Sequence, residues 1–212
     1  MSFSTWLVFL ASSLLTTFSP GPAILLAISN SFAFGPRKAF FSSAGNIAGI
    51  FVVSSAAMIG LGVLLNTSAM WFNIFKTVGA AYLIYLGWRQ WTSRVNLFDS
   101  PLQPASQSGQ SDLRLFRQGV LVAVTNPKSI LFFTALFPQF INPGVPMAGQ
   151  FLILTTTFAA SAVMAHGSYV LLTRQLRGWF SIPGRVRLFN RCAGAAFVLL
   201  GASVLRLARQ VR

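Results

Sequence analysis

The sequence predicts an all-α integral membrane protein with six transmembrane helices. Of its 212 residues, 54% are hydrophobic and only 8% are charged, whereas a soluble domain carries about 25% charged residues. Six apolar runs that meet or approach the length of a bilayer crossing follow one another along the chain. The basic residues lie at the ends of these runs and between them. A water-soluble fold does not fit this pattern.

The length of each apolar run defines the predicted spans. A bilayer core of about 30 Å requires about 20 mainly apolar residues in a helix. No charged residue occurs before position 37, so the first run lacks the basic start of a secretory signal and is predicted to be a retained span. The third and sixth runs are short, but flanking Lys and Arg can reach toward the headgroups. The predicted spans are residues 3–34, 40–65, 71–88, 119–137, 148–173 and 192–207.

A polar stretch divides the chain into two halves. Residues 92–116 contain Ser, Gln, Pro and Gly, together with both acidic residues of the protein, Asp99 and Asp112. This stretch is predicted to be a flexible cytoplasmic linker, too short to be a second soluble domain. We therefore expect a single transmembrane domain over residues 1–212, with a first repeat at about 1–91 and a second at about 117–212.

An internal repeat relates the two halves. The third span has a Gly-Ala-Ala triplet at 79–81 followed by Gly87, and the sixth has the same triplet at 194–196 followed by Gly201. Proline-containing breaks also recur in the first and fourth spans. Because each unit has three spans, the second would enter the membrane from the opposite side, so the repeat is predicted to be inverted, as in many secondary transporters. The alternative is chance recurrence of small residues, which help any membrane helices to pack.

The distribution of basic residues predicts the orientation, since cytoplasmic loops retain Lys and Arg. One set of alternate loops is rich in them, whereas the opposite side has Lys76 and the tail residues Arg206, Arg209 and Arg212. With six spans, both termini are predicted to be periplasmic, although the basic tail argues for the reverse. The rich set contains Arg37, Lys38, Arg89, Arg94, Arg114, Arg117, Arg174, Arg177, Arg185, Arg187 and Arg191.

Composition excludes several functional classes. The net charge of +14 resembles that of a nucleic-acid binder, but such a protein gathers basic residues and aromatic platforms on one solvated surface. Here the Phe residues lie inside uncharged stretches, so no nucleic-acid partner is expected. The single cysteine, Cys192, cannot form an intrachain disulfide, and one His with two carboxylates supplies no zinc ligand set. We expect no metal, no cofactor and no catalytic residue.

Two breaks inside the spans predict a central binding site. Pro20-Gly21-Pro22 should interrupt the first helix near its middle, and Asn126-Pro127 repeats this device in the fourth. Lys128 follows directly, about 16 Å below Arg117 if each residue rises about 1.5 Å. A buried ammonium is a functional-site hypothesis, and beside a half-helix N-terminus it would bind a carboxylate. The alternative is a structural kink whose lysine neutralises a helix C-terminus or reaches the headgroups.

Two other polar residues lie inside the predicted spans. Asn46 is a candidate substrate ligand and, equally, a residue that holds helices together. His166 is a candidate proton relay because imidazole titrates near neutral pH, and alternatively a hydrogen bonder in helix packing. No Asp or Glu lies in any span. Neutral zwitterions are therefore favoured as substrates over basic ones, and proton coupling would depend on Lys128, His166 and tyrosines.

A series of motifs runs in order from the N-terminus to the sixth span. It comprises Ser19-Pro20-Gly21-Pro22, Gly35-x-Arg37-x-Ala39, Gly45-Asn46-x-x-Gly49, Lys76-x-x-Gly79-Ala80-x-Tyr82-Leu83-x-Tyr85-Leu86-Gly87, Phe116-x-x-Gly119, Asn126-Pro127-Lys128, Phe132-Phe133 and Pro138-Gln139-Phe140. Together these motifs resemble the LysE/RhtB family of amino-acid exporters.

The resemblance implies a bacterial inner-membrane exporter of amino acids or their derivatives, driven by the proton gradient without ATP. It also implies a central site made of Pro20, Gly21, Pro22, Asn126, Pro127 and Lys128. Members of the family handle lysine, threonine, homoserine, leucine or cysteine, and the lack of carboxylates in the spans favours a neutral one.

Other functions stay open on the sequence alone. The chain would be a membrane scaffold or a complex subunit if it moved no substrate, and it is open whether it forms a homo-oligomer. A metal-ion exporter is a further alternative, since related branches of the superfamily have been linked to metal ions. A Ser129 or Ser168 nucleophile paired with Lys128 or His166 would make an intramembrane hydrolase, but no motif surrounds either serine.

Overall fold

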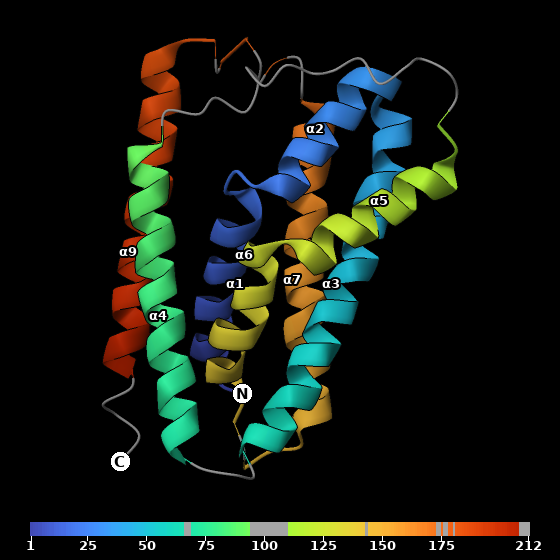
Figure 1. Cartoon of the computed structure of the whole chain (residues 1–212). Helices are drawn as coiled ribbons and strands as arrows, with labels where there is room; N and C mark the ends of the chain where they lie inside the picture. Colours follow the sequence, from blue (N-terminus) through green and yellow to red (C-terminus); the bar gives the residue numbers. More distant parts are fainter. Residues whose placement is uncertain are drawn as a thin grey trace.

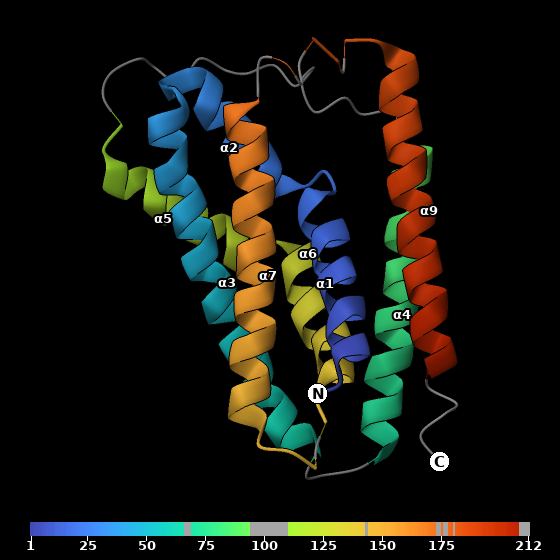
Figure 2. The same cartoon turned by 180° about the vertical axis from the view of Figure 1, so that it is seen from behind.

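The computed structural model describes residues 1–65, 69–93, 110–142, 144–172, 175, 178–179 and 181–207. Within these residues all regular structure is helical (Figures 1 and 2). The helices are α1 (Phe3–Phe18), α2 (Pro22–Phe34), α3 (Pro36–Leu65), α4 (Ala69–Thr92), α5 (Asp112–Thr125), α6 (Pro127–Leu131), the π-helical turn η1 (Phe132–Leu136), the 3-10 turn η2 (Phe137–Phe140), α7 (Met147–Leu171) and α9 (Pro183–Leu207).

The candidate membrane spans are fewer than the six predicted. Among the described residues, the helices Pro36–Gly60 and Met147–Leu171 are long and apolar enough to cross a bilayer, and the number rises to four if each of two bent helix pairs is one span. Helices do form over the third and sixth predicted spans, with 24 residues in α4 and 25 in α9. These two helices are not among the candidate membrane spans, and α9 includes Arg185, Arg187 and Arg191. Six spans therefore stay a prediction.

Two helices begin earlier than the predicted spans, because each includes charged residues that the prediction placed outside the membrane. The α3 helix begins at Pro36 and takes in Arg37 and Lys38, because a helix continues past the apolar core into the headgroup region. Asp112, predicted to lie in the linker, begins α5, where the Ser111 side chain caps the helix by accepting from the Arg114 N–H at 3.3 Å. Most of the predicted linker, residues 94–109, lies outside the described residues.

Both predicted helix breaks are confirmed. The chain bends by 50° between α1 and α2, and by 50° between α5 and the segment that begins with α6. Proline is the first residue of the helix after each break, at Pro22 and Pro127, where its missing N–H leaves no intrahelical bond unmade. The two breaks lie near the centre of the bundle (Figure 1).

The repeated glycines pack against one another. The α4 and α9 helices lie side by side and run in opposite directions (Figures 1 and 2). A Cβ on Gly194 would lie 2.6 Å from the Gly87 carbonyl oxygen, and a Cβ on Gly201 would lie 2.9 Å from the Ala80 oxygen. Only glycine permits such backbone contact. Close packing therefore gives a physical reason for these glycines in both helices.

Glycines also join α3 to α5. A Cβ on Gly45 would collide with the Phe116 carbonyl oxygen, and one on Gly119 with the Ser42 oxygen. A separate hydrophobic cluster contains five buried phenylalanines, Phe9, Phe132, Phe133, Phe137 and Phe158, and the ring centroids of Phe132 and Phe158 are 4.5 Å apart. The cluster fixes α1, η1, η2 and α7 around the helix breaks.

Candidate functional site

A lysine from the second break contacts the first break. The Lys128 Nζ donates a hydrogen bond to the Ser19 carbonyl oxygen at 2.8 Å. The same ammonium lies so close to Gly21 that a Cβ there would be 3.1 Å from Nζ. The Asn126 side chain accepts from the Lys128 N–H at 3.1 Å and so caps α6. Sequence reasoning singled out Gly21, Asn126 and Lys128, and the fold brings all three together.

Two donors from outside α1 satisfy the carbonyl groups at its end. Lys128 bonds the Ser19 oxygen, and the Tyr169 hydroxyl of α7 donates to the Phe18 oxygen at 3.0 Å. The last carbonyls of a helix have no intrahelical partner, and in a bilayer such groups need one within the protein. The sequence also allowed a purely structural role, in which Lys128 neutralises the C-terminus of a helix. The bond from Lys128 to the Ser19 carbonyl oxygen has this form. Tyr169 was not predicted, because nothing in its local sequence distinguishes it from other aromatic residues in apolar spans.

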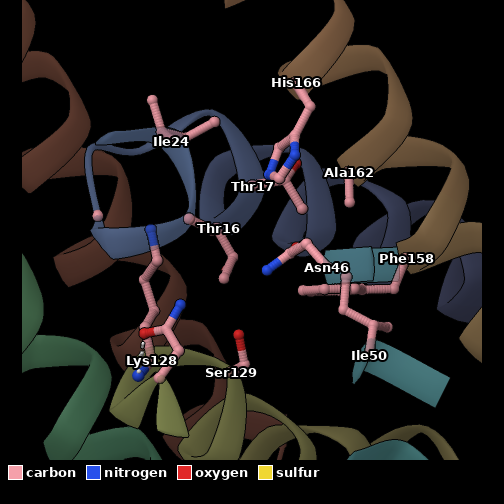
Figure 3. A pocket seen from close by; sticks show the side chains of 13 residues that line it. Thr16, Thr17, Ile24, Asn46, Ile50, Lys128, Ser129, Phe158, Ala162 and His166 are labelled. Atoms are coloured by element: carbon pink, nitrogen blue, oxygen red, sulfur yellow. Dashed lines mark hydrogen bonds between the residues drawn. The ribbon is translucent and has the colours of Figure 1, made fainter. Parts of the chain in front are cut away.

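A small cavity of about 30 Å³ lies between the breaks (Figure 3). Of the predicted site residues, Gly21, Asn46, Asn126, Lys128 and His166 line it, whereas Pro20, Pro22 and Pro127 do not. The three prolines shape the breaks on either side. The complete lining is Thr16, Thr17, Gly21, Ala23, Ile24, Asn46, Ile50, Asn126, Lys128, Ser129, Phe158, Ala162 and His166.

Several buried polar atoms at this cavity have no hydrogen-bond partner among the described residues. They are Thr16 Oγ1, Asn46 Nδ2 and His166 Nδ1. Most buried polar groups in proteins are paired, so unpaired ones require an explanation. Sequence reasoning missed Thr16; the only signal for it is a Thr16-Thr17 pair that comes just before the break. The lining contains no Asp or Glu, which leaves Lys128 and His166 as its ionisable members.

A second cavity of about 10 Å³ lies on the side of α4 and α9, where Tyr82 and Phe197 contribute to its lining. Thr16 and Lys128 line this cavity as well as the first. These two side chains therefore stand between the two spaces.

The serine pairs of the hydrolase alternative are not formed in the described structure. The Ser168 hydroxyl donates to the Met164 carbonyl oxygen of its own helix at 2.7 Å. Ser129 lines the first cavity, but among the described residues it has no hydrogen bond to Lys128 Nζ or to His166. Across all the residues that the structure describes, no group of three or more His, Cys, Asp or Glu side chains could hold a metal ion.

Comparison with known proteins identifies relatives along nearly the whole chain. A family model described as LysE type translocator matches residues 14–208. The chain is 37% identical over 202 residues to the Homoserine/homoserine lactone efflux protein of Salmonella typhimurium, a match that covers 95% of this chain and 96% of the relative. It is 34% identical over 203 residues to an uncharacterized membrane protein of Vibrio cholerae, with 95% and 96% covered.

A more distant relative is the uncharacterized membrane protein YrhP of Bacillus subtilis, 28% identical over 188 residues, with 86% of this chain and 89% of the relative covered. No solved structure matches the chain. The family model spans both helix breaks and the cavity between them, and the resemblance predicted from the motifs is confirmed. The chain is a membrane protein of the LysE family of translocators.

Proposed function

We propose that this protein is a secondary active exporter of neutral amino acids or their small derivatives, which bind between the two helix breaks. The observation that carries the proposal is the bond from Lys128 Nζ to the Ser19 carbonyl oxygen, 2.8 Å long, which joins the breaks beside a polar cavity. Backbone polar groups at membrane depth are tolerated where they line a site or are buried in protein. Broken helices at the centre of a bundle are a common binding device in secondary transporters.

Lys128 and the start of α2 bind the carboxylate of the substrate. Gly21 precedes this 13-residue helix as its N-cap and supplies no side-chain cap, so the N–H groups of the first turn and the positive end of the helix dipole are available to an anion. Ala23 and Ile24 of this turn line the cavity with Lys128. The substrate's ammonium then replaces the Lys128 ammonium at the Ser19 carbonyl oxygen, and Lys128 turns to the carboxylate.

Transport follows from movement of two inverted repeats around this site. The repeats are residues 1–91 and 117–212, joined by the linker at about 92–116, and together they make six spans. Equal 50° bends at the two breaks and the antiparallel contact of α4 with α9 through Gly87 and Gly194 support this symmetry. A cavity of about 30 Å³ accommodates about two water molecules. It must enlarge before a substrate enters, as alternating access requires.

The favoured substrate is homoserine, with threonine, leucine and cysteine as other neutral candidates. Support comes from the printed name of the Salmonella relative and from the absence of Asp and Glu in the cavity lining. A basic side chain would find no countercharge there, and an unpaired buried charge is costly. Proton coupling is part of the proposal because Lys128 and His166 are the ionisable side chains of the lining.

We place the protein in the bacterial inner membrane with both termini in the periplasm. The α2–α3 junction, the end of α4 and the starts of α5 and α9 lie on one side of the bundle, whereas α1 begins and α9 ends toward the other (Figure 1). The first side carries Arg37, Lys38, Arg89, Arg114 and Arg185, as expected for a cytoplasmic face.

Reconstitution of the purified protein tests the proposal. We expect wild-type vesicles to accumulate labelled homoserine when a pH gradient is imposed, and Lys128→Ala to lower the rate by about 100-fold or more because the breaks lose their shared cation. Lys38→Ala, a lysine outside the cavity that donates to the Gln110 carbonyl oxygen, is the matched control and should transport normally. Wild-type vesicles that move none of the candidate amino acids would favour the scaffold alternative, and normal transport by Lys128→Ala would remove this residue from the mechanism.

A further inference from the structure

Three helices each direct one unpartnered polar atom into the cavity between the breaks. Thr16 of α1 and Asn46 of α3 are 3% exposed, and His166 of α7 is 4% exposed. Their atoms Oγ1, Nδ2 and Nδ1 have no hydrogen-bond partner within the part of the chain that the structure describes. In Figure 3, Asn46 and Thr16 point toward one another across the cavity, with His166 beside them. Three orphaned atoms around one space indicate a ligand that supplies their partners.

The Thr16 hydroxyl differs from its neighbours on the same helix. Buried hydroxyls in helices usually donate to a carbonyl oxygen one turn earlier, and Ser12 and Ser13 do so at 2.6 and 2.8 Å. Thr17, which lines the same cavity, donates to the Ser13 oxygen at 2.8 Å. Thr16 makes no such bond. Its hydroxyl is therefore free for a partner inside the cavity.

Close packing fixes Asn46 where it is. Gly45 and Gly49 bring α3 into backbone contact with α5, and a Cβ on Gly119 would lie 2.8 Å from the Asn46 backbone nitrogen. The backbone of Asn46 is therefore held beside the cavity by the contact between α3 and α5. Because Nδ2 is a donor, its partner must be an acceptor such as a hydroxyl or carbonyl oxygen.

We propose that Thr16, Asn46 and His166 form a side-chain subsite that selects substrates with a hydrogen-bonding oxygen over apolar neutral amino acids of similar size. The inference rests on the proposed function and deepens it: Lys128 and the start of α2 bind the charged end of the substrate, and the subsite binds the other end. Homoserine offers a hydroxyl at that end. An apolar side chain would leave the Asn46 donor and the Thr16 hydroxyl unpaired, and sites of this kind discriminate strongly against such analogues.

A competition experiment tests the subsite. Wild-type and variant proteins are reconstituted in vesicles, and the uptake of homoserine is compared with that of 2-aminobutyrate, which lacks the hydroxyl. We expect the wild type to favour homoserine at least tenfold, and Thr16→Val and Asn46→Leu each to reduce this ratio about tenfold, chiefly because homoserine is taken up less efficiently. Thr16→Ser restores a hydroxyl and should restore the ratio.

Two matched controls separate recognition from general packing. Thr17→Val removes a hydroxyl from the same cavity that is already bonded within its helix, and Thr155→Val removes a buried, unpartnered hydroxyl of α7 outside the cavity lining. Both should keep the wild-type ratio. An unchanged ratio in Thr16→Val, or an equal loss of both compounds, overturns the subsite while leaving the exporter proposal standing. Wild-type vesicles that transport neither compound would overturn both.

Discussion

The two helix breaks have the same bend but different chemistry. Between α1 and α2 the chain leaves the helix for three residues, and its exposed groups depend on other helices: Lys128 bonds the Ser19 oxygen and Tyr169 the Phe18 oxygen. Between α5 and α6 a single residue, Asn126, turns the chain and caps the next helix with its own side chain. The backbone groups of the first break thus depend on hydrogen-bond donors from other helices. The second break caps its own helix, and its Lys128 is one of those donors.

This difference teaches how a near-symmetric pair of helices forms an asymmetric site. A self-capped break can present a rigidly placed lysine, because the helix that carries it begins at a defined residue. An uncapped break can accept that lysine or a ligand in its place. Substitutions at each break should therefore have different effects.

Among three further substitutions, the largest effect is expected at the open break, where Gly21→Val adds a branched side chain. Gly21 has an extended backbone with φ of −173°, so valine causes no backbone strain there. Its Cβ would begin 3.1 Å from Lys128 Nζ and fill the space proposed for the carboxylate. We expect transport of homoserine in vesicles to fall more than about tenfold, with little change in thermal unfolding because the atoms that valine crowds are at the end of the flexible Lys128 side chain. Gly60→Val in α3, where nothing lies within 4 Å, is the control; equal transport by both variants would contradict an open first break.

A smaller effect is expected at the self-capped break. Asn126→Ala removes the oxygen that accepts from the Lys128 N–H, and loss of an N-cap typically lowers the free energy of unfolding by about 1 kcal/mol. Thermal unfolding of the detergent-purified protein measures this loss. Asn126→Ser should recover most of it because a serine hydroxyl also caps helices. If alanine and serine variants unfold at the same temperature, the second break does not depend on its cap.

The smallest effect is expected from Tyr169→Phe. The change leaves the ring in place and removes the bond to the Phe18 carbonyl oxygen, which contributes about 0.5–1.5 kcal/mol in a typical case. We expect slightly earlier thermal unfolding and nearly normal transport, since Lys128 still holds the neighbouring carbonyl. Tyr85→Phe, on a side chain that is 54% exposed, should change neither property. A loss of transport as large as that of Gly21→Val would assign Tyr169 a direct part in binding.

Residues with unusual chemistry for a membrane span were predictable from the sequence. Proline and glycine located both breaks, and a lysine in an apolar run located the cavity, because each violates an ordinary rule of membrane helices. Asn46 and His166 were recognised on the same ground. Both residues line the cavity, whereas their roles stay proposals.

Residues whose type is ordinary could not be singled out. Thr16 resembles Thr17 in sequence, and only the folded helix shows that Thr17 bonds its own backbone whereas Thr16 does not. Tyr169 acquires its role from a carbonyl that lies 151 positions away along the chain. The bounds of α9 differed from the predicted sixth span because three arginines near its start marked a charged loop in the sequence, and arginine is compatible with a helix beyond the bilayer core.

Thr16 and Lys128 also act as a partition, since they line one cavity beside α3 and α7 and another beside α4. A lysine has several rotatable bonds and can reorient while the helices stay in place, whereas collective movements of helices take microseconds to milliseconds. If the Lys128 ammonium leaves the Ser19 oxygen, one of the two side chains between the spaces is displaced before any helix moves. The first event in opening the site is then a local rotation of one side chain, and the slow rearrangement of the bundle begins from a chamber that is already wider.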